Sequence, residues 1–384
     1  MKENSNMDQN IDEFKPTANQ PVNYQALLKG LQDLYPMIQV LDKDGKVVEE
    51  DLVPDLSDEQ LIKLMEKMVF TRCLYEETMT FSKQGRLGFY APTLGQEASK
   101  MASAMVIDKE DWLYGAYRDI PQLISHGATI AQGFNWSRGH VHGGSYGSQG
   151  EVKAMVPQII IGAQIIQACG NALGQKLNGE KQVTFTYIGD GGTSQGDFYE
   201  GLNFAGCYQV PLVVIVQNNG YAISTPRKLA TRAQTLAQKA AAAGIPSVQV
   251  DGMDPLATYI VTKQARDWAA AGKGPVLIET MTNRMGPHST AGDDPSRYRD
   301  KTSFEYWKER DPLKRFRNYL SERDLWSHEH EEQIKKEYVK EIEREMEEAE
   351  SQPDMTIAES LEWMYADPPA HILEQIEKYQ EKGV

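Results

Sequence analysis

A chain of 384 residues with 40% hydrophobic side chains is long enough for one large globular domain or two modest ones. Its 55 acidic residues against 40 basic ones give a formal charge of −15, which argues against nucleic acid or an anionic membrane as the main partner. The start of the chain lacks the apolar core of a signal peptide, and no later run reaches the roughly 18 apolar residues that span a bilayer. Because its three cysteines, Cys73, Cys169 and Cys207, have no metal-ligand spacing, we expect a reduced, cytoplasmic protein.

The first 24 residues are polar and lack apolar periodicity, which is typical of a flexible arm. Ser57 and Gln60 form the S-x-x-Q pattern of a capping box, and an apolar run over 61–81 follows it. We therefore predict a long buried helix that ends near Gly85. The predicted organisation is a partly flexible arm over 1–50, an α/β domain over 51–310 and a helical extension over 311–384.

From residue 183 to 280 the pattern alternates between strands and helices. The apolar, β-branched runs predict strands over 183–188, 211–216 and 275–281, and the segments between them predict helices over 193–208 and 233–244. Strands separated by helices favour a doubly wound parallel sheet, in which ligands bind at the carboxyl ends of the strands.

The segment 327–350 predicts an amphipathic helix that lies on the surface of the domain. Ile334, Tyr338, Ile342 and Met346 recur at i, i+4 spacing, and the intervening residues are mostly charged.

The loop GDGGTSQGD over 189–197 follows the first predicted strand of this region. It is not a Walker A loop, because Gly196 is followed by Asp197 instead of Lys, and it is not a dinucleotide fingerprint, because Ser194 stands where glycine is needed. Backbone amides from Gly191 onward can hold an anion, but Asp190 would repel that anion unless a cation lay between them.

Magnesium meets this requirement, because it binds one or two protein oxygens together with phosphates and water. The neighbouring strand over 211–216 is followed by Asn218 and Asn219, whose amide oxygens are suitable ligands. The irregular backbone at Gly220 and Tyr221 can expose a carbonyl as well.

The GDG of residues 189–191, followed by the NN of residues 218–219, resembles the thiamine diphosphate motif. This resemblance implies that Asp190, Asn219 and the carbonyl of Tyr221 bind Mg²⁺, and that Gly191 and Gly192 contact the cofactor. Two tight turns that merely end strands are the alternative.

Further segments resemble the α subunit of the 2-oxo acid dehydrogenases, most closely the bacterial pyruvate dehydrogenase type. They are GFYAPTLGQEA, YRDIPQLISHG, IIIGAQ, TYIGDGGTSQGDFYEGLNFA, VQNNGYAIST, VDGMDP and GPHSTAGDDPSRYR, within about residues 50 to 369. The resemblance implies a thiamine diphosphate-binding fold, oxidative decarboxylation of pyruvate, and acetyl transfer to the lipoyl group of an acyltransferase. Branched-chain 2-oxo acid and acetoin dehydrogenases share nearly all of these motifs, and a cofactor-free scaffold subunit is a further alternative.

The same resemblance assigns roles to individual residues. Tyr117, Arg118 and Arg284 would contact the diphosphate, Ile159 and Ile161 would form the apolar wall that holds the cofactor bent, and His288 would handle protons or orient the incoming acceptor. Asp293, Tyr298 and Arg299 would hold the loop of His288 folded, and Ser289 matches a serine that is phosphorylated in mitochondrial relatives.

The glutamate that activates the cofactor belongs to a β subunit in this family, and the sequence contains one α/β unit with the magnesium motif. The resemblance therefore implies an α₂β₂ heterotetramer.

His140 and His142 lie two residues apart and would face the same side of an extended segment, as in some metal sites. Because no nearby Cys or carboxylate completes such a site, we expect a solvated loop.

Overall fold

The computed structural model describes residues 30–144, 146 and 152–383. The first 29 residues, where we expect the flexible arm to begin, lie outside this part of the chain. Within it, a parallel seven-stranded sheet has the order β1-β8-β9-β5-β4-β2-β3, which confirms the predicted doubly wound α/β class. The strands are β1 (Met37–Ile38), β2 (Trp112–Ala116), β3 (Ala154–Gln158), β4 (Thr184–Gly189), β5 (Leu212–Asn218), β8 (Ser247–Asp251) and β9 (Val276–Met281), with a separate hairpin of β6 (Tyr221–Ala222) and β7 (Thr225–Pro226).

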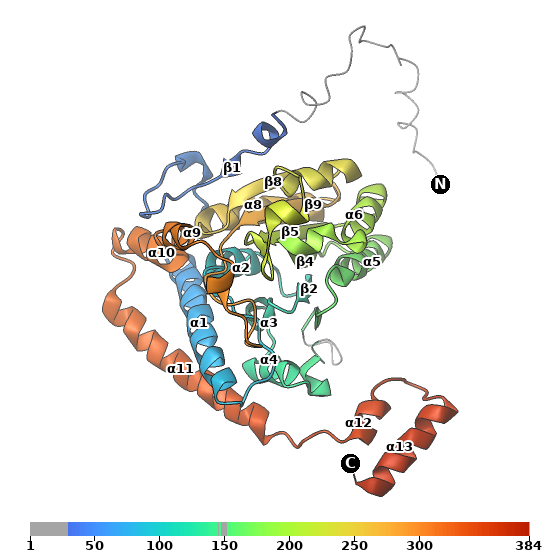
Figure 1. The fold of residues 1–384 in the computed structure, drawn as a ribbon. Helices are drawn as coiled ribbons and strands as arrows, with labels where there is room; N and C mark the ends of the chain where they lie inside the picture. Colours follow the sequence, from blue (N-terminus) through green and yellow to red (C-terminus); the bar gives the residue numbers. More distant parts are fainter. Residues whose placement is uncertain (1–29, 145, 147–151, 384) are drawn as a thin grey trace, which may run out of the picture.

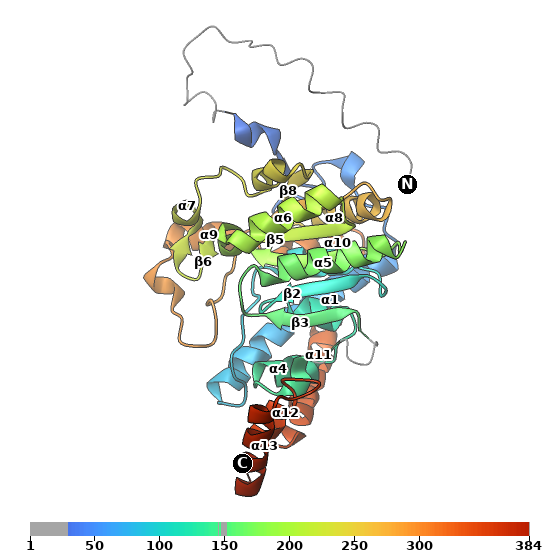
Figure 2. The ribbon, with the colours of Figure 1, turned by 90° about the vertical axis from the view of Figure 1, so that its right-hand side faces the viewer.

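Helices cover both faces of the sheet (Figures 1 and 2). Alternate residues of β5 point to opposite faces, so Val213 and Ile215 join one apolar core and Val214 and Val216 join another. The first core includes α1 (Asp58–Lys83), α2 (Glu97–Ala104), α3 (Ile120–Ser125), α4 (Ile130–Ser137), α8 (Pro255–Ala270), α10 (Pro312–Ser321) and α11 (His328–Ser351). The second includes α5 (Ala163–Leu177), α6 (Gly196–Tyr208) and the 3₁₀ helix η6 (Ala237–Ala243).

The two long helices, α1 and α11, form where the capping and apolar patterns of the sequence predict them. The Ser57 hydroxyl accepts a hydrogen bond from the Gln60 amide, and the Gln60 side-chain oxygen accepts one from the Ser57 amide, so the capping box begins α1. Ser327 caps α11, whose apolar stripe packs along α1 (Figure 1). Ile342 and Met346 of this stripe are fully buried, whereas the Tyr338 ring is half-buried, edge-on against Phe70.

Two predicted helices differ from the structure. The segment 193–208 is divided into a 3₁₀ turn, η5 (Asp190–Ser194), and α6, which begins at Gly196. The alanine-rich segment 233–244 is the shorter 3₁₀ helix η6 instead of an α-helix. The Leu236 and Ala237 amides donate to Glu279, and Lys239 donates to Thr193; these hydrogen bonds to distant residues override the helix propensity of alanine there.

The remaining elements are short connections or lie at the ends of the chain. Helices α12 (Ile357–Glu362) and α13 (Ala370–Lys382) form a hairpin beyond α11 (Figure 1). No helix of the described residues combines the length and apolarity needed to cross a bilayer. The connections are η2 (Leu31–Leu34), η3 (Glu50–Leu52), η4 (Val141–Gly144), α7 (Arg227–Ala230), η7 (Pro295–Arg297) and α9 (Lys301–Lys308).

Candidate functional site

A cavity of about 420 Å³ opens at the carboxyl edge of the sheet, where β2, β3, β4, β5 and β9 end. Because parallel strands end at the same edge, loops that are far apart in sequence meet there. The cavity is lined by every residue that the sequence predicts to bind cofactor or metal: Tyr117, Arg118, Ile159, Ile161, Asp190, Gly191, Gly192, Asn219, Tyr221, Arg284 and His288.

Asp190 directly follows β4 and is only 2% exposed. Burial raises the pKa of its carboxyl group to about 6, although hydrogen bonds from the backbone of Asp190 and Asn219 act in the opposite direction. Its Oδ2 atom has no hydrogen-bond partner in the described part of the chain. A buried carboxylate oxygen without a partner is costly, and a cation placed there would offset that cost.

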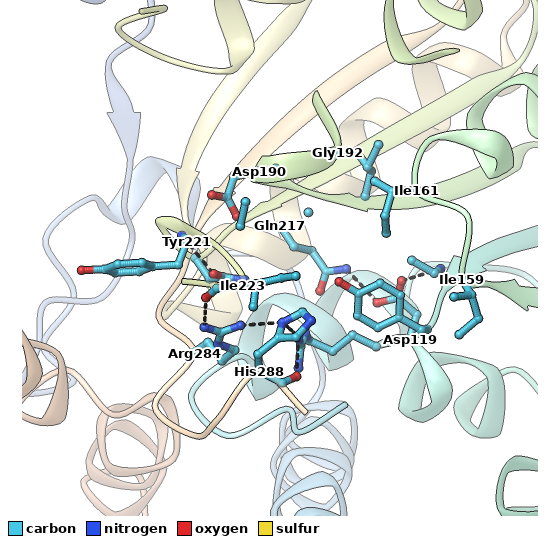
Figure 3. A pocket seen from close by; sticks show the side chains of 18 of the residues that line it. Asp119, Ile159, Ile161, Asp190, Gly192, Gln217, Tyr221, Ile223, Arg284 and His288 are labelled. Atoms are coloured by element: carbon cyan, nitrogen blue, oxygen red, sulfur yellow. Dashed lines mark hydrogen bonds between the residues drawn. The ribbon is translucent and has the colours of Figure 1, made fainter. Parts of the chain in front are cut away.

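The two asparagines after β5 differ in their surroundings. The Asn218 side chain donates to Glu279 Oε1 over 2.7 Å and accepts from the Gly220 amide over 3.1 Å, so it holds the turn and points away from the cavity. Asn219 lines the cavity, and its Oδ1 accepts from the Tyr221 amide over 3.3 Å. The Tyr221 ring points away from the cavity (Figure 3) and packs against the Tyr298 ring, with centroids 5.6 Å apart. The oxygens that this turn can offer to a ligand are therefore the Asn219 amide and backbone carbonyls.

The glycines after Asp190 are required by close packing. A Cβ atom on Gly191 would lie 2.5 Å from the Ala222 Cβ atom, and one on Gly192 would lie 2.5 Å from Ile188 Cγ1. Side chains at these positions would push the β6 turn and the end of β4 away. Gly191 and Gly192 can thus take these positions after Asp190 only because they have no side chains.

Arg118 and Arg284 form the positive side of the cavity, and His288 lies between them. The guanidinium Nη1 of Arg284 lies 2.8 Å from His288 Nδ1 (Figure 3). The Nη2 atom of Arg118 lies 3.1 Å from the same atom. Burial lowers the pKa of His288 to about 4, and the charges of both arginines act in the same direction. Because a guanidinium can only donate, Nδ1 must accept, so His288 is neutral and carries its hydrogen on Nε2.

The loop after β9 is held by the residues predicted for this task, with one difference. Asp293 Oδ2 accepts from the His288 amide over 2.6 Å and from the Tyr298 hydroxyl over 2.7 Å, and Tyr298 also accepts from Arg284. The Arg299 guanidinium makes no hydrogen bond among the described residues and instead lies over the rings of Tyr221 and Tyr298. Ser289 is 8% exposed within this loop.

Ile159 and Ile161 lie across the cavity from Tyr221 (Figure 3). The Ile159 side chain is 55% exposed, so it stands at the mouth, whereas Ile161 is half-buried beside Gly192. Their apolar side chains can contact the body of an organic ligand whose charged end lies near Asp190.

Sequence reasoning missed a group of buried polar residues under the cavity. Asp119 accepts from Lys100 Nζ over 2.8 Å and from Gln217 Nε2 over 2.7 Å, and Lys100 also donates to the Arg118 carbonyl over 3.0 Å. These bonds fix the backbone that carries Arg118. A lysine such as Lys100 gives no sequence signal that it is buried. Gln96, which also lines the cavity, lies in the segment GFYAPTLGQEA whose family resemblance could have drawn attention to it.

His140 and His142 lie in or beside η4, not in an extended segment. Their rings are 5.0 Å apart, and His142, which is exposed, also contacts Trp363 edge-on. Among the described residues, no group of three or more His, Cys, Asp or Glu side chains is arranged to hold a metal ion. A metal at Asp190 would therefore need amide, carbonyl or phosphate oxygens.

Comparisons with known proteins agree on the family of this chain. Residues 65–358 match the family described as "Dehydrogenase E1 component". The pyruvate dehydrogenase E1 component subunit alpha of Staphylococcus aureus (strain Mu50 / ATCC 700699) is 52% identical over 356 residues, which cover 93% of this chain and 96% of that protein. The subunit of the same name from Staphylococcus epidermidis (strain ATCC 12228 / FDA PCI 1200) is 51% identical with the same coverage.

Proposed function

Because this chain belongs to the dehydrogenase E1 component family, which depends on thiamine diphosphate, we propose that it is the α subunit of an E1 enzyme that acts on pyruvate. The enzyme would decarboxylate pyruvate oxidatively and acetylate the lipoyl group of an acyltransferase. The observation that carries the proposal is the cavity itself. It is lined by a buried carboxylate, one oxygen of which has no hydrogen-bond partner among the described residues, and by two buried guanidinium groups. A diphosphate bridged by a divalent cation satisfies both signs of charge.

In this proposal Mg²⁺ binds Asp190, the Asn219 amide oxygen and the Tyr221 carbonyl. Arg118 and Arg284 bind diphosphate oxygens, and the amides of Gly191 and Gly192 approach the same group. Tyr117 adds a diphosphate contact, and Ile159 and Ile161 contact the organic part. When bound, thiamine diphosphate supplies the electron sink that accepts the carbanion formed when a 2-oxo acid loses carbon dioxide.

His288 acts as a neutral hydrogen-bond donor through Nε2, at the entrance that a lipoyl group would use. Since Nδ1 accepts from Arg284 and Arg118, the ring cannot rotate without losing both bonds. We expect a His288→Ala variant to keep more decarboxylation in an artificial-acceptor assay than acetyl transfer to a lipoyl domain. Equal loss of both activities would contradict this role.

The cavity also supports an α₂β₂ assembly. No glutamate is among the cavity-lining residues that the structure describes, and both oxygens of Asp119 are engaged by donors of this chain. Cofactor activation needs a carboxylate that can exchange a proton. The β subunit of the E1 component would supply it.

The substrate can be tested on the tetramer reconstituted with its β subunit. Steady-state rates with pyruvate and with 3-methyl-2-oxobutanoate should give a higher kcat/KM for pyruvate. A preference for the branched substrate would assign the chain to the branched-chain enzymes. Failure of the tetramer to bind thiamine diphosphate with Mg²⁺ in calorimetry would favour a scaffold subunit.

A further inference from the structure

Three residues that line the cavity contain buried polar side-chain atoms without a hydrogen-bond partner in the described chain: Asp190, Arg284 and Gln96. The atoms are Asp190 Oδ2, Arg284 Nε, and both amide atoms of Gln96. Asp190 and Arg284 have proposed ligands, so their unpartnered atoms are explained by what they bind. The Gln96 side chain is fully buried, and nothing in the proposed function uses it.

Gln96 lies between the two loops that carry the arginines. It precedes α2, one turn before Lys100, which donates to the Arg118 carbonyl. The segment leading to it contacts both loops, because Arg118 Nη1 donates to the Pro92 carbonyl over 2.6 Å and the Met285 amide donates to the Leu94 carbonyl over 2.9 Å.

We propose that Gln96 is a further binding residue of the cavity, whose amide donates a hydrogen bond to a phosphate oxygen of the bound diphosphate. A neutral donor suits this position, since a carboxylate there would pair with Arg118 or Arg284 and reduce their attraction for the anion. Among the described residues the amide has no hydrogen-bond partner, so keeping this donor in place lowers the stability of the ligand-free protein. This inference rests on the proposed function.

The test uses the α₂β₂ tetramer and a Gln96→Leu variant, which keeps the approximate volume and removes both polar atoms. Magnesium pyrophosphate is the probe, measured by calorimetry, because it contains the diphosphate without the rings. We expect its Kd, and that of thiamine diphosphate with Mg²⁺, to rise roughly tenfold or more. We also expect the ligand-free variant to melt at the same temperature as the unchanged tetramer or higher.

The matched control is Thr258→Val. It removes an equally buried hydroxyl in α8, which lies outside the cavity lining and has no hydrogen-bond partner in the part of the chain that the structure describes. It should leave both Kd values unchanged. Unchanged Kd values in Gln96→Leu would overturn the inference, as would a lower melting temperature with unchanged binding, which would indicate a structural amide satisfied by water. If Gln96→Leu binds pyrophosphate normally but has a higher KM for pyruvate, the amide contacts the substrate carboxylate and the diphosphate assignment is wrong. Failure of the unchanged tetramer to bind either probe would instead contradict the proposed function.

Discussion

At the residue scale, the buried carboxyl group of Asp190 destabilises the ligand-free protein, and a bound cation would offset that cost. Its carboxylate is buried, its pKa is raised by that burial, and Oδ2 has no partner in the described structure. A group retained under these conditions lowers the stability of the ligand-free protein, because ionisation is less favourable in the folded state than in the unfolded chain.

Substitution of Asp190 should therefore have opposite effects on the thermal stability of the ligand-free protein and on its affinity for the cofactor. We expect Asp190→Asn to abolish magnesium-dependent binding of thiamine diphosphate, with a loss of at least about a hundredfold, because it removes the charged ligand. The ligand-free variant should melt at a higher temperature than the unchanged protein at pH 7. Calorimetry and thermal melting of the tetramer measure the two effects, and a variant that binds normally would contradict the metal assignment.

His288 provides a second prediction at this scale. Its pKa falls to about 4 in the folded protein, below the usual value of 6.5, so the folded state binds fewer protons than the unfolded chain between these values. The contribution of His288 to stability is therefore present above about pH 6.5 and is lost as the pH falls toward 4. Titration of ¹³C-labelled histidine rings in the tetramer, with the His288 signal assigned by a His288→Asn variant, should show a neutral Nε2–H ring at pH 5.5. Protonation with a midpoint near 6.5 would contradict the account.

At the scale of elements, η6 connects the two loops that face the proposed metal site. At its start, Glu279 accepts from the amides of Leu236 and Ala237 and from the Asn218 side chain. Within it, Lys239 donates to the carbonyl and hydroxyl oxygens of Thr193 over 2.8 and 2.9 Å. The Thr193 hydroxyl in turn donates to the Asp190 carbonyl over 2.7 Å. The 3₁₀ helix thus fixes the position of the Asp190 loop relative to the Asn219 turn.

Removing this connection should loosen the site without touching a proposed ligand. We expect Lys239→Met to weaken binding of thiamine diphosphate with Mg²⁺ roughly tenfold, because a buried hydrogen bond from a charged donor contributes about 1.5–3 kcal/mol. Lys239→Arg should recover part of the loss. Lys273→Met is the control, since Lys273 is exposed and lies over the Trp268 ring. Equal affinities in Lys239→Met and Lys273→Met would show that η6 does not position the site.

These elements also show how far the sequence could predict the structure. The capping box of α1 and the stripe of α11 are local signals, and both helices begin where those signals predict. The alanine-rich segment was predicted wrongly as an α-helix, because its shape depends on Glu279 and Lys239 contacts that join distant parts of the chain. The polar groups of Lys100 and Gln96 were missed for the same reason. Motif spacing named the residues that meet in the cavity, but their hydrogen-bond partners are set by the tertiary fold.

At the scale of the whole molecule, we expect this chain to contribute one half of a catalytic site. The cavity opens beside the exposed side chain of Ile159. Its described lining contains two carboxyl groups: Asp190, the proposed metal ligand, and Asp119, whose oxygens both accept from donors of this chain. We expect the purified chain to bind thiamine diphosphate weakly and to decarboxylate no pyruvate. The tetramer should bind the cofactor more tightly and decarboxylate pyruvate. Light scattering and steady-state assays before and after addition of the β subunit measure this, and robust activity of the chain by itself would refute it.

The central claim is that a divalent cation bridges Asp190 and a diphosphate. The most direct test is a crystal of the α₂β₂ tetramer grown with Mn²⁺ and thiamine diphosphate, analysed by anomalous scattering. The account predicts one anomalous peak within about 2.2 Å of Asp190, of the Asn219 amide oxygen and of the Tyr221 carbonyl, with diphosphate oxygens completing the coordination. A bound diphosphate with no peak at Asp190 would contradict it.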